Sequence, residues 1–119
     1  MEFNHFLTSY MPNVNIGSKV HFENMLKESV LAEKCGYATV SIPEHHLINL
    51  LMMPSPLQMA VKIASITKKI NITTGIVVLP IHDMRTYAGE VTTADILTDG
   101  RLILGSLDPI RPRRLNNNC

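Results

Sequence analysis

The chain has 119 residues and a formal net charge of +1, with 45% hydrophobic and 18% charged residues. This composition is typical of one globular domain and excludes an intrinsically disordered chain, and the near-neutral charge gives no electrostatic reason to expect nucleic acid or an anionic membrane as a partner. No apolar run approaches the ~18 residues of a membrane span, and residues 1–12 lack a signal-peptide pattern. We therefore expect a cytoplasmic protein without a membrane partner.

The first half of the chain predicts a strand, a helix and a second strand. Residues 2–8 form the first strand, and a loop rich in asparagine follows. Ser18 is a plausible N-cap of the helix, since apolar residues follow it at helical spacing. Gly36 occupies the position of a helix-terminating glycine. Residues 37–43 then form the second strand.

The next segment predicts a second helix and a third strand. Ser55 caps the helix and Pro56 lies in its first turn, where a missing N–H costs nothing. The buried face of this helix is expected to consist of Leu57, Ala60, Ile63, Ala64 and Thr67. Residues 70–79 are β-branched and apolar and form the third strand, with both faces buried towards its end, as in a parallel sheet.

A third helix and a fourth strand complete the pattern. Asp83 is the expected cap of the helix, and residues 101–105 form the strand. The inner face of the helix is expected to contain Met84, Tyr87, Ala88, Val91, Ile96 and Leu97. Alternation of strands and helices predicts an α/β fold with a parallel sheet over residues 1–105. Residues 106–119 show no periodicity and are expected to form an irregular C-terminal tail.

The most informative cluster is Glu44-His45-His46, which follows the second strand directly. Titratable side chains at the end of a strand are typical of catalytic sites at one rim of a sheet, and histidine changes its charge near neutral pH. Glu44 is expected to orient an imidazole or to pair with a cation, and His46 to bond to backbone. His82 is expected to be a loop or cap residue.

Three other kinds of site receive little support. A metal site formed by the Glu44–His46 cluster and His82 is disfavoured, because adjacent histidines on an extended strand point to opposite faces; we expect no metal. A nucleophilic serine is disfavoured because Ser41 and Ser55 lack the glycines of a nucleophile elbow. The two cysteines, Cys35 and Cys119, form no disulfide framework, and Cys35 is expected to be buried at the end of the first helix.

Several motifs together resemble the bacterial luciferase-like flavin monooxygenases. They occur in the order and spacing of that family over residues 1–105: Glu44-His45-His46, Pro54-Ser55-Pro56-Leu57, Thr74-Gly75-Ile76-Val77-Val78-Leu79-Pro80-Ile81-His82, Asp95, and Gly100-Arg101-Leu102-Ile103-Leu104-Gly105. The resemblance implies a partial (β/α)8 TIM barrel, with about four parallel strands and three intervening helices. It also implies binding of reduced FMN, with the deazaflavin F420 less favoured, and oxidation of a small organic substrate by O₂.

The resemblance also assigns roles to individual residues. His45 is similar to the family's catalytic histidine, which handles protons near the flavin. Gly75 and Ile76 resemble the pair whose non-proline cis peptide lies under the flavin ring, and glycine there lets the backbone approach the ring closely. Glu44 is counted with these two residues as part of the cofactor site. A flavin reductase that supplies reduced flavin is an implied partner.

Two features depart from the family. Asp108 stands where the luciferases place an arginine that grips the FMN phosphate, and the strands of the second half-barrel are missing from this chain. Four strands alone are expected to leave unpaired edges and a concave apolar face, which predicts a homo-oligomer. The apolar run at residues 50–53 is expected to cover the sheet or an oligomer contact rather than to act as a lid.

Three functions stay open at this point. The first is a flavin-dependent monooxygenase, which would act as an oligomer of this shortened chain. The second is a non-catalytic flavin-binding or oligomerising half-barrel module. The third is a folded relic without activity.

Overall fold

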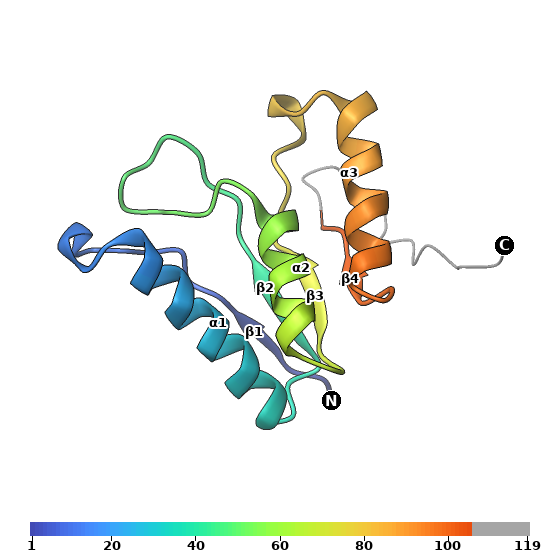
Figure 1. The fold of residues 1–119 in the computed structure, drawn as a ribbon, viewed down its shortest axis with the longest axis horizontal. Coiled ribbons are helices and arrows are strands. Elements are labelled where there is room, and N and C mark those ends of the chain that lie inside the picture. The colour runs from blue at the N-terminus through green and yellow to red at the C-terminus, as the bar shows by residue number, and fades with distance from the viewer. Residues whose placement is uncertain (106–119) are drawn as a thin grey trace, which may run out of the picture.

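The structure, a computed structural model, describes residues 1–105 and contains one parallel sheet with three helices on one face (Figure 1). The four strands, in the order in which they lie side by side, are β1 (Asn4–Phe6), β2 (Thr39–Ile42), β3 (Asn71–Thr74) and β4 (Leu102–Ile103). All neighbours are parallel. The connecting helices are α1 (Ser18–Lys34), α2 (Pro56–Ile66) and α3 (Met84–Leu97). Strands in consecutive order, each followed by a helix, are the arrangement of half a (β/α)8 barrel, so the predicted fold class is confirmed.

The strands are shorter than the apolar segments that predicted them. The segment 70–79 leaves the strand conformation after Thr74 and enters the 3₁₀ helix η2 (Leu79–Ile81), where the Ile81 N–H donates to the Val78 carbonyl. The short β1 has only three residues. The expected irregular tail at 106–119 lies outside the described residues. No helix within residues 1–105 combines the length and apolar character needed to cross a bilayer.

Backbone geometry fixes where the helices begin and end. The N-cap of α1 is Gly17, with φ +83°, and not Ser18, which is already the first helical residue. Gly36, with φ +82°, ends the helix as predicted: its N–H donates to the Glu33 carbonyl while the next N–H donates to the Ala32 carbonyl. This pair of bonds is a Schellman motif, which glycine accommodates without a Cβ penalty. Asp83 caps α3, as predicted, by accepting the Arg85 N–H.

The core lies between the sheet and the first two helices. Val40 and Ile42 of β2 and Ile72 of β3 are fully buried against Met25 of α1 and Ile63 of α2. The predicted buried face of α2 is confirmed, since Leu57, Ala60, Ile63, Ala64 and Thr67 are all buried.

Predictions of burial failed in two places. Of the apolar residues expected on the inner face of α3, only Tyr87 is buried, whereas Ile96 and Leu97 are 70% and 57% exposed. The helix packs mainly on α2, so one narrow stripe, Tyr87 with Ala94, is enough to cover that contact. Cys35 is exposed because it caps the C-terminus of α1 beyond the last residue that faces the sheet.

The face of the sheet opposite the helices is more polar than expected. Because successive strand side chains point to opposite faces, the residues of β2 and β3 on the face away from the helices are Thr39, Ser41, Asn71 and Thr73. The Asn4 amide donates to the Ser41 hydroxyl at 2.9 Å across this face. Phe6 is 54% exposed, yet the face as a whole is not the concave apolar surface that motivated the predicted homo-oligomer. The apolar face therefore gives no support to self-association, and the unpaired edges of β1 and β4 within residues 1–105 are what remains of that prediction.

The apolar loop at residues 50–53 and His5 of β1 can now be placed. The apolar run at 50–53 packs on the segment after β1: the Met52 N–H donates to the Ser9 carbonyl, and Met53 is 1% exposed. This arrangement agrees with a covering loop. His5 of β1 lies 3.5 Å from the Glu28 carboxylate and so faces α1.

Two charged side chains fasten the turn between α2 and β3. One carboxylate oxygen of Glu33 accepts the N–H groups of residues 68, 69 and 70 at 2.6–3.0 Å. The Arg101 guanidinium donates to the Ala64 carbonyl at 2.8 Å, to the Thr67 hydroxyl at 3.0 Å and to the Ile70 carbonyl at 3.4 Å. These bonds satisfy backbone groups at the end of α2 and hold β3 in register.

Candidate functional site

Glu44 is the centre of a hydrogen-bonded cluster at the carboxyl ends of β2 and β3. Its side chain is completely buried. One carboxylate oxygen, Oε2, accepts the Val78 N–H at 2.7 Å. The other, Oε1, lies 2.7 Å from Nε2 of His46 and 2.7 Å from Nε2 of His82. Strands β2 and β3 are adjacent and parallel, so the loops that leave them meet at one rim and bring together residues 38 positions apart.

These contacts decide the charge of the carboxylate. Burial alone would raise the pKa of Glu44, but the hydrogen bonds from His46, the Val78 N–H and His82 outweigh it and hold the pKa below its ordinary value. Glu44 is therefore ionised at neutral pH. Each imidazole must carry a proton on Nε2 to donate to it, which fixes the tautomer of a neutral ring.

The Tyr87 ring packs against the face of the His82 ring. Their ring centroids are 4.2 Å apart with an interplanar angle of 30°. Burial, together with the negative charges of Glu44 and Glu90, raises the pKa of Tyr87 to about 12, so its hydroxyl stays protonated. His82 is thus held by a carboxylate at its edge and by an aromatic ring on its face.

His45, the predicted catalytic residue, lies beside this cluster and not in it. Its backbone N–H donates to the Met53 carbonyl at 2.8 Å. The side chain is half-buried, and within residues 1–105 its ring makes no hydrogen bond. The structure thus places His45 at the expected rim, at the carboxyl end of β2.

Two expectations for the neighbouring histidines need revision. His46 bonds to the Glu44 carboxylate and not to backbone. His82 does cap η2, but it also reaches the same carboxylate, a role that the sequence analysis missed. The available signal was the predicted topology itself, because parallel strands bring the residues that follow each of them to one rim.

Gly75 and Ile76 lie at the same rim, directly after β3. The peptide bond between them is cis, as the resemblance implies. A Cβ placed on Gly75 would lie 3.3 Å from the Ser41 Cβ, a close approach that favours glycine. Ile76 is 38% exposed. The prediction that both faces of residues 70–79 are buried towards the end of the segment is therefore wrong at this position.

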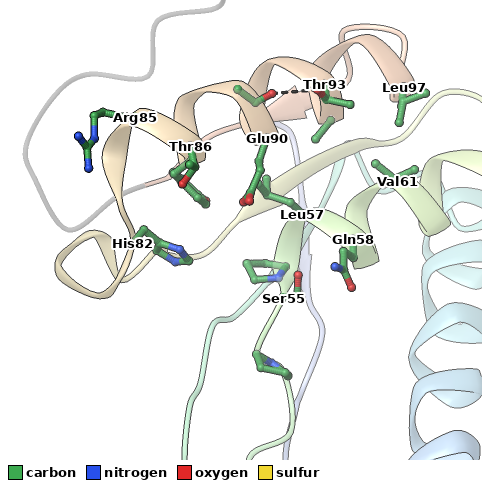
Figure 2. Close-up of a pocket in the computed structure, with 15 residues that line it drawn as sticks. Ser55, Leu57, Gln58, Val61, His82, Arg85, Thr86, Glu90, Thr93 and Leu97 are labelled. Carbon is green, nitrogen blue, oxygen red and sulfur yellow. Dashed lines mark hydrogen bonds between the residues drawn. The ribbon is translucent and has the colours of Figure 1, made fainter.

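A hollow of about 890 Å³ lies between α2 and α3 in the helix layer (Figure 2). His82 stands at its edge, and Ser55, Gln58 and Glu90 contribute polar groups to its lining. The hollow therefore adjoins the Glu44 cluster through His82, while Gly75 and Ile76 lie outside its lining.

Comparison with known proteins gives the family. The family model of luciferase-like monooxygenases matches residues 1–106. This chain belongs to that family. The uncharacterized protein y4vJ of Sinorhizobium fredii is 31% identical over 105 residues, which cover 88% of this chain and 30% of that protein. The alkanal monooxygenase alpha chain of Photorhabdus laumondii is 30% identical over 105 residues, or 88% and 29% of the two chains. The chain thus spans less than a third of the length of these curated relatives.

Solved structures agree on the fold. The oxygenating constituent of 3,6-diketocamphane monooxygenase from Pseudomonas putida, in complex with FMN, superposes with a TM-score of 0.82 at 24% identity over 89% of this chain and 29% of that one. The coenzyme F420-dependent tetrahydromethanopterin reductase of Methanopyrus kandleri has a TM-score of 0.69 at 21% identity over 88% and 26%. Both FMN and F420 proteins therefore share this fold.

Proposed function

We propose that this chain provides the catalytic rim of a flavin-dependent monooxygenase that uses reduced FMN and O₂ to oxidise a small organic substrate. The observation that carries the proposal is the meeting of two elements at the carboxyl ends of β2 and β3. One is the imidazole of His45 with the Glu44 cluster beside it, and the other is the cis Gly75–Ile76 pair. Family membership supports the reaction class.

The residues present fit a flavin ring system at this rim. Gly75 has no side chain to hold the ring away from the backbone, and Ile76 offers an exposed apolar surface beside it. Phe6 and Ser41 lie near Gly75 on the same open face. Reduced FMN, when bound, supplies the electrons for the reaction with O₂. The position of Asp108, where the family has a phosphate-binding arginine, lies outside the described residues.

Each polar residue of the rim has a distinct proposed role. His45 gives or takes a proton, because its side chain is only partly buried and its ring nitrogens have no hydrogen-bond partner within residues 1–105. Glu44 acts at the cofactor site as a positioning residue: its carboxylate is completely buried and already accepts three hydrogen bonds. It therefore fixes the orientation of His46 and His82 and lowers the mobility of both loops.

Partners follow from the reaction class. A flavin reductase would supply the reduced cofactor, and the relative from Acinetobacter baylyi is itself described as the oxygenase component of a flavin-dependent trigonelline monooxygenase. A flavin is favoured over F420 because the relative from Acinetobacter baylyi, at 31% identity, is a flavin-dependent monooxygenase, whereas the F420-dependent reductase is 21% identical. A homo-oligomer and a cytoplasmic location remain part of the proposal.

A second candidate is a flavin-binding or oligomerising half-barrel without oxygenase activity. The observation that favours it is that the four strands within residues 1–105 supply only part of a barrel rim. Most of the substrate pocket of a complete barrel comes from loops after all eight strands. Both candidates predict flavin binding, and they differ in turnover.

The test combines flavin binding with oxygen consumption. FMN is titrated with the protein under reducing and oxidising conditions, and absorbance and fluorescence are followed; a flavin reductase and NADH are then added and O₂ is measured with an alkanal substrate. Saturable binding with turnover that His45→Ala abolishes, and that Lys34→Ala at the exposed C-terminal end of α1 leaves unchanged, supports the monooxygenase. Binding without turnover supports the module, and no spectral change at high micromolar FMN overturns both.

A further inference from the structure

The geometry points to a binding site for a first-row divalent metal ion formed by Glu44, His46 and His82. Their ligand atoms, one carboxylate oxygen and two imidazole nitrogens, all lie within 4.8 Å of one another. The inference does not depend on flavin binding, because the three side chains converge on their own through backbone that β2, β3 and η2 hold in place.

The distances are close to those that one ion requires. Bond lengths of ~2.0–2.2 Å from zinc to nitrogen or oxygen place two ligands roughly 3–3.5 Å apart, depending on the angle between them. Oε1 of Glu44 is 2.7 Å from each Nε2, so the three atoms need to move apart by less than about 1 Å. The two rings meet edge to face, with centroids 6.4 Å apart and an interplanar angle of 73°, which lets their Nε2 atoms converge on one point.

The chemistry of the ligands selects the ion. Two imidazoles and one carboxylate suit Zn²⁺ and its neighbours in the first row, whereas Mg²⁺ and Ca²⁺ prefer sites made of oxygen alone. On binding, the ion takes the place of the proton on each Nε2, and a neutral ring changes tautomer so that its one proton sits on Nδ1.

Surrounding contacts favour a site that is held on one side and open on the other. The Val78 N–H fixes the second carboxylate oxygen of Glu44 at 2.7 Å, and Tyr87 packs on the His82 ring, so two ligands have outer partners that orient them. His46 and His82 are 32% and 21% exposed, which gives an ion a path from solvent. Three protein ligands leave a coordination position for water.

The sequence argument against a metal site rested on the opposite directions of adjacent histidines on a strand, and it does not apply to this set of ligands. Within residues 1–105, His46 contacts Glu44, whereas the His45 ring makes no hydrogen bond. The third ligand comes instead from position 82, and it shares the Glu44 carboxylate with His46 across two parallel strands. His45 stays outside the cluster and provides a matched control.

The experiment is a titration of the complete, metal-free chain with Zn²⁺, followed by calorimetry, and with Co²⁺, followed by visible absorption. We expect one Zn²⁺ per chain and a Co²⁺ spectrum of nitrogen and oxygen ligation without a thiolate band. His46→Ala and His82→Ala should each weaken Zn²⁺ binding at least roughly 10–100-fold, the loss that removal of a mere outer-sphere partner already causes. His45→Ala and Cys35→Ser should bind like the wild type.

Circular dichroism on each variant separates loss of a ligand from loss of the fold. If His82→Ala unfolds, His82→Gln, which keeps a hydrogen-bond donor for Glu44, replaces it in the titration. A wild-type affinity no tighter than millimolar overturns the proposal. Equal Zn²⁺ affinity in the wild type and the folded His46 and His82 variants does so as well, since the ion would then bind elsewhere.

Discussion

Glu44 should be the polar residue whose loss costs this fold most. In Glu44→Ala the Val78 N–H loses its acceptor in a partly buried position, at a cost of about 1–3 kcal/mol. His46 and His82 are partly exposed and can turn to water, so their two bonds add only about 0.5–1 kcal/mol each. The sum is about 2–5 kcal/mol, a large part of the stability of a chain of this size.

The pH dependence follows from the direction of the pKa shift. Folding lowers the pKa of Glu44 below its ordinary value, so the unfolded state takes up a proton first as the pH falls. The contribution of the carboxylate is complete above about pH 4.5 and is lost as the pH falls through the pKa of the folded state. Stability of the wild type should therefore approach that of Glu44→Gln in acid and exceed it at pH 7.

Urea unfolding followed by circular dichroism measures both effects. Midpoints of the wild type, Glu44→Ala and Glu44→Gln are compared at pH 7 and at several values below pH 4.5, with a common slope. A Glu44→Ala variant within about 0.5 kcal/mol of the wild type at pH 7 would refute the reasoning, because a surface substitution of no consequence lies in that range.

Further predictions concern the framework of the site. Arg101→Ala should lower the free energy of unfolding by about 1–3 kcal/mol in the same assay, since the Ala64 carbonyl and its neighbours at the end of α2 lose their donor; an unchanged midpoint would contradict this. Gly105→Ala should destabilise the sheet, because a Cβ there would overlap the Thr74 carbonyl oxygen. Gly89→Ala is the matched control: its Cβ meets nothing within 4 Å in the middle of α3, so it should stabilise by about 0.5–1 kcal/mol in thermal unfolding. If the two glycine substitutions had equal effects, the close approach of Gly105 to the Thr74 carbonyl oxygen would be wrong.

Local signals were sufficient for the order of the elements and for several helix ends. Gly36 and Asp83 act through their own backbone and side-chain bonds to residues at most four positions away, so their roles can be read from the sequence. Alternation of apolar strands and helices likewise fixes a parallel sheet, since the crossover connections leave few other arrangements.

Burial was predictable only where two packing layers meet. The stripe on α2 faces both the sheet and α3, and its residues are buried as expected. The apolar residues of α3, such as Ile96, lack a covering element within residues 1–105, and hydropathy alone cannot report this. The same holds for Cys35, whose exposure depends on where α1 projects beyond the sheet.

Only part of the candidate site could be predicted from the sequence. The position of Glu44 and His45 at a rim follows from the strand that precedes them. The bond from His82 to Glu44 depends on how the chain turns through η2 after β3, and nothing in the residues between them specifies that turn. The prediction that His46 bonds to backbone was wrong for the same reason. The path of the folded chain, which the sequence does not show, brings the Glu44 carboxylate within reach of the His46 ring.

The central claim, that flavin binds at the rim after β2 and β3, is tested most directly by an FMN titration of the wild type, Gly75→Ala and Gly89→Ala. The added methyl group at Gly75 lies at the proposed flavin surface, whereas the one at Gly89 points into open space on α3. We predict saturable binding to the wild type and Gly89→Ala, and binding to a folded Gly75→Ala that is weaker by at least about tenfold, or about 1.4 kcal/mol. Equal affinity in all three chains would place the flavin elsewhere and contradict the account.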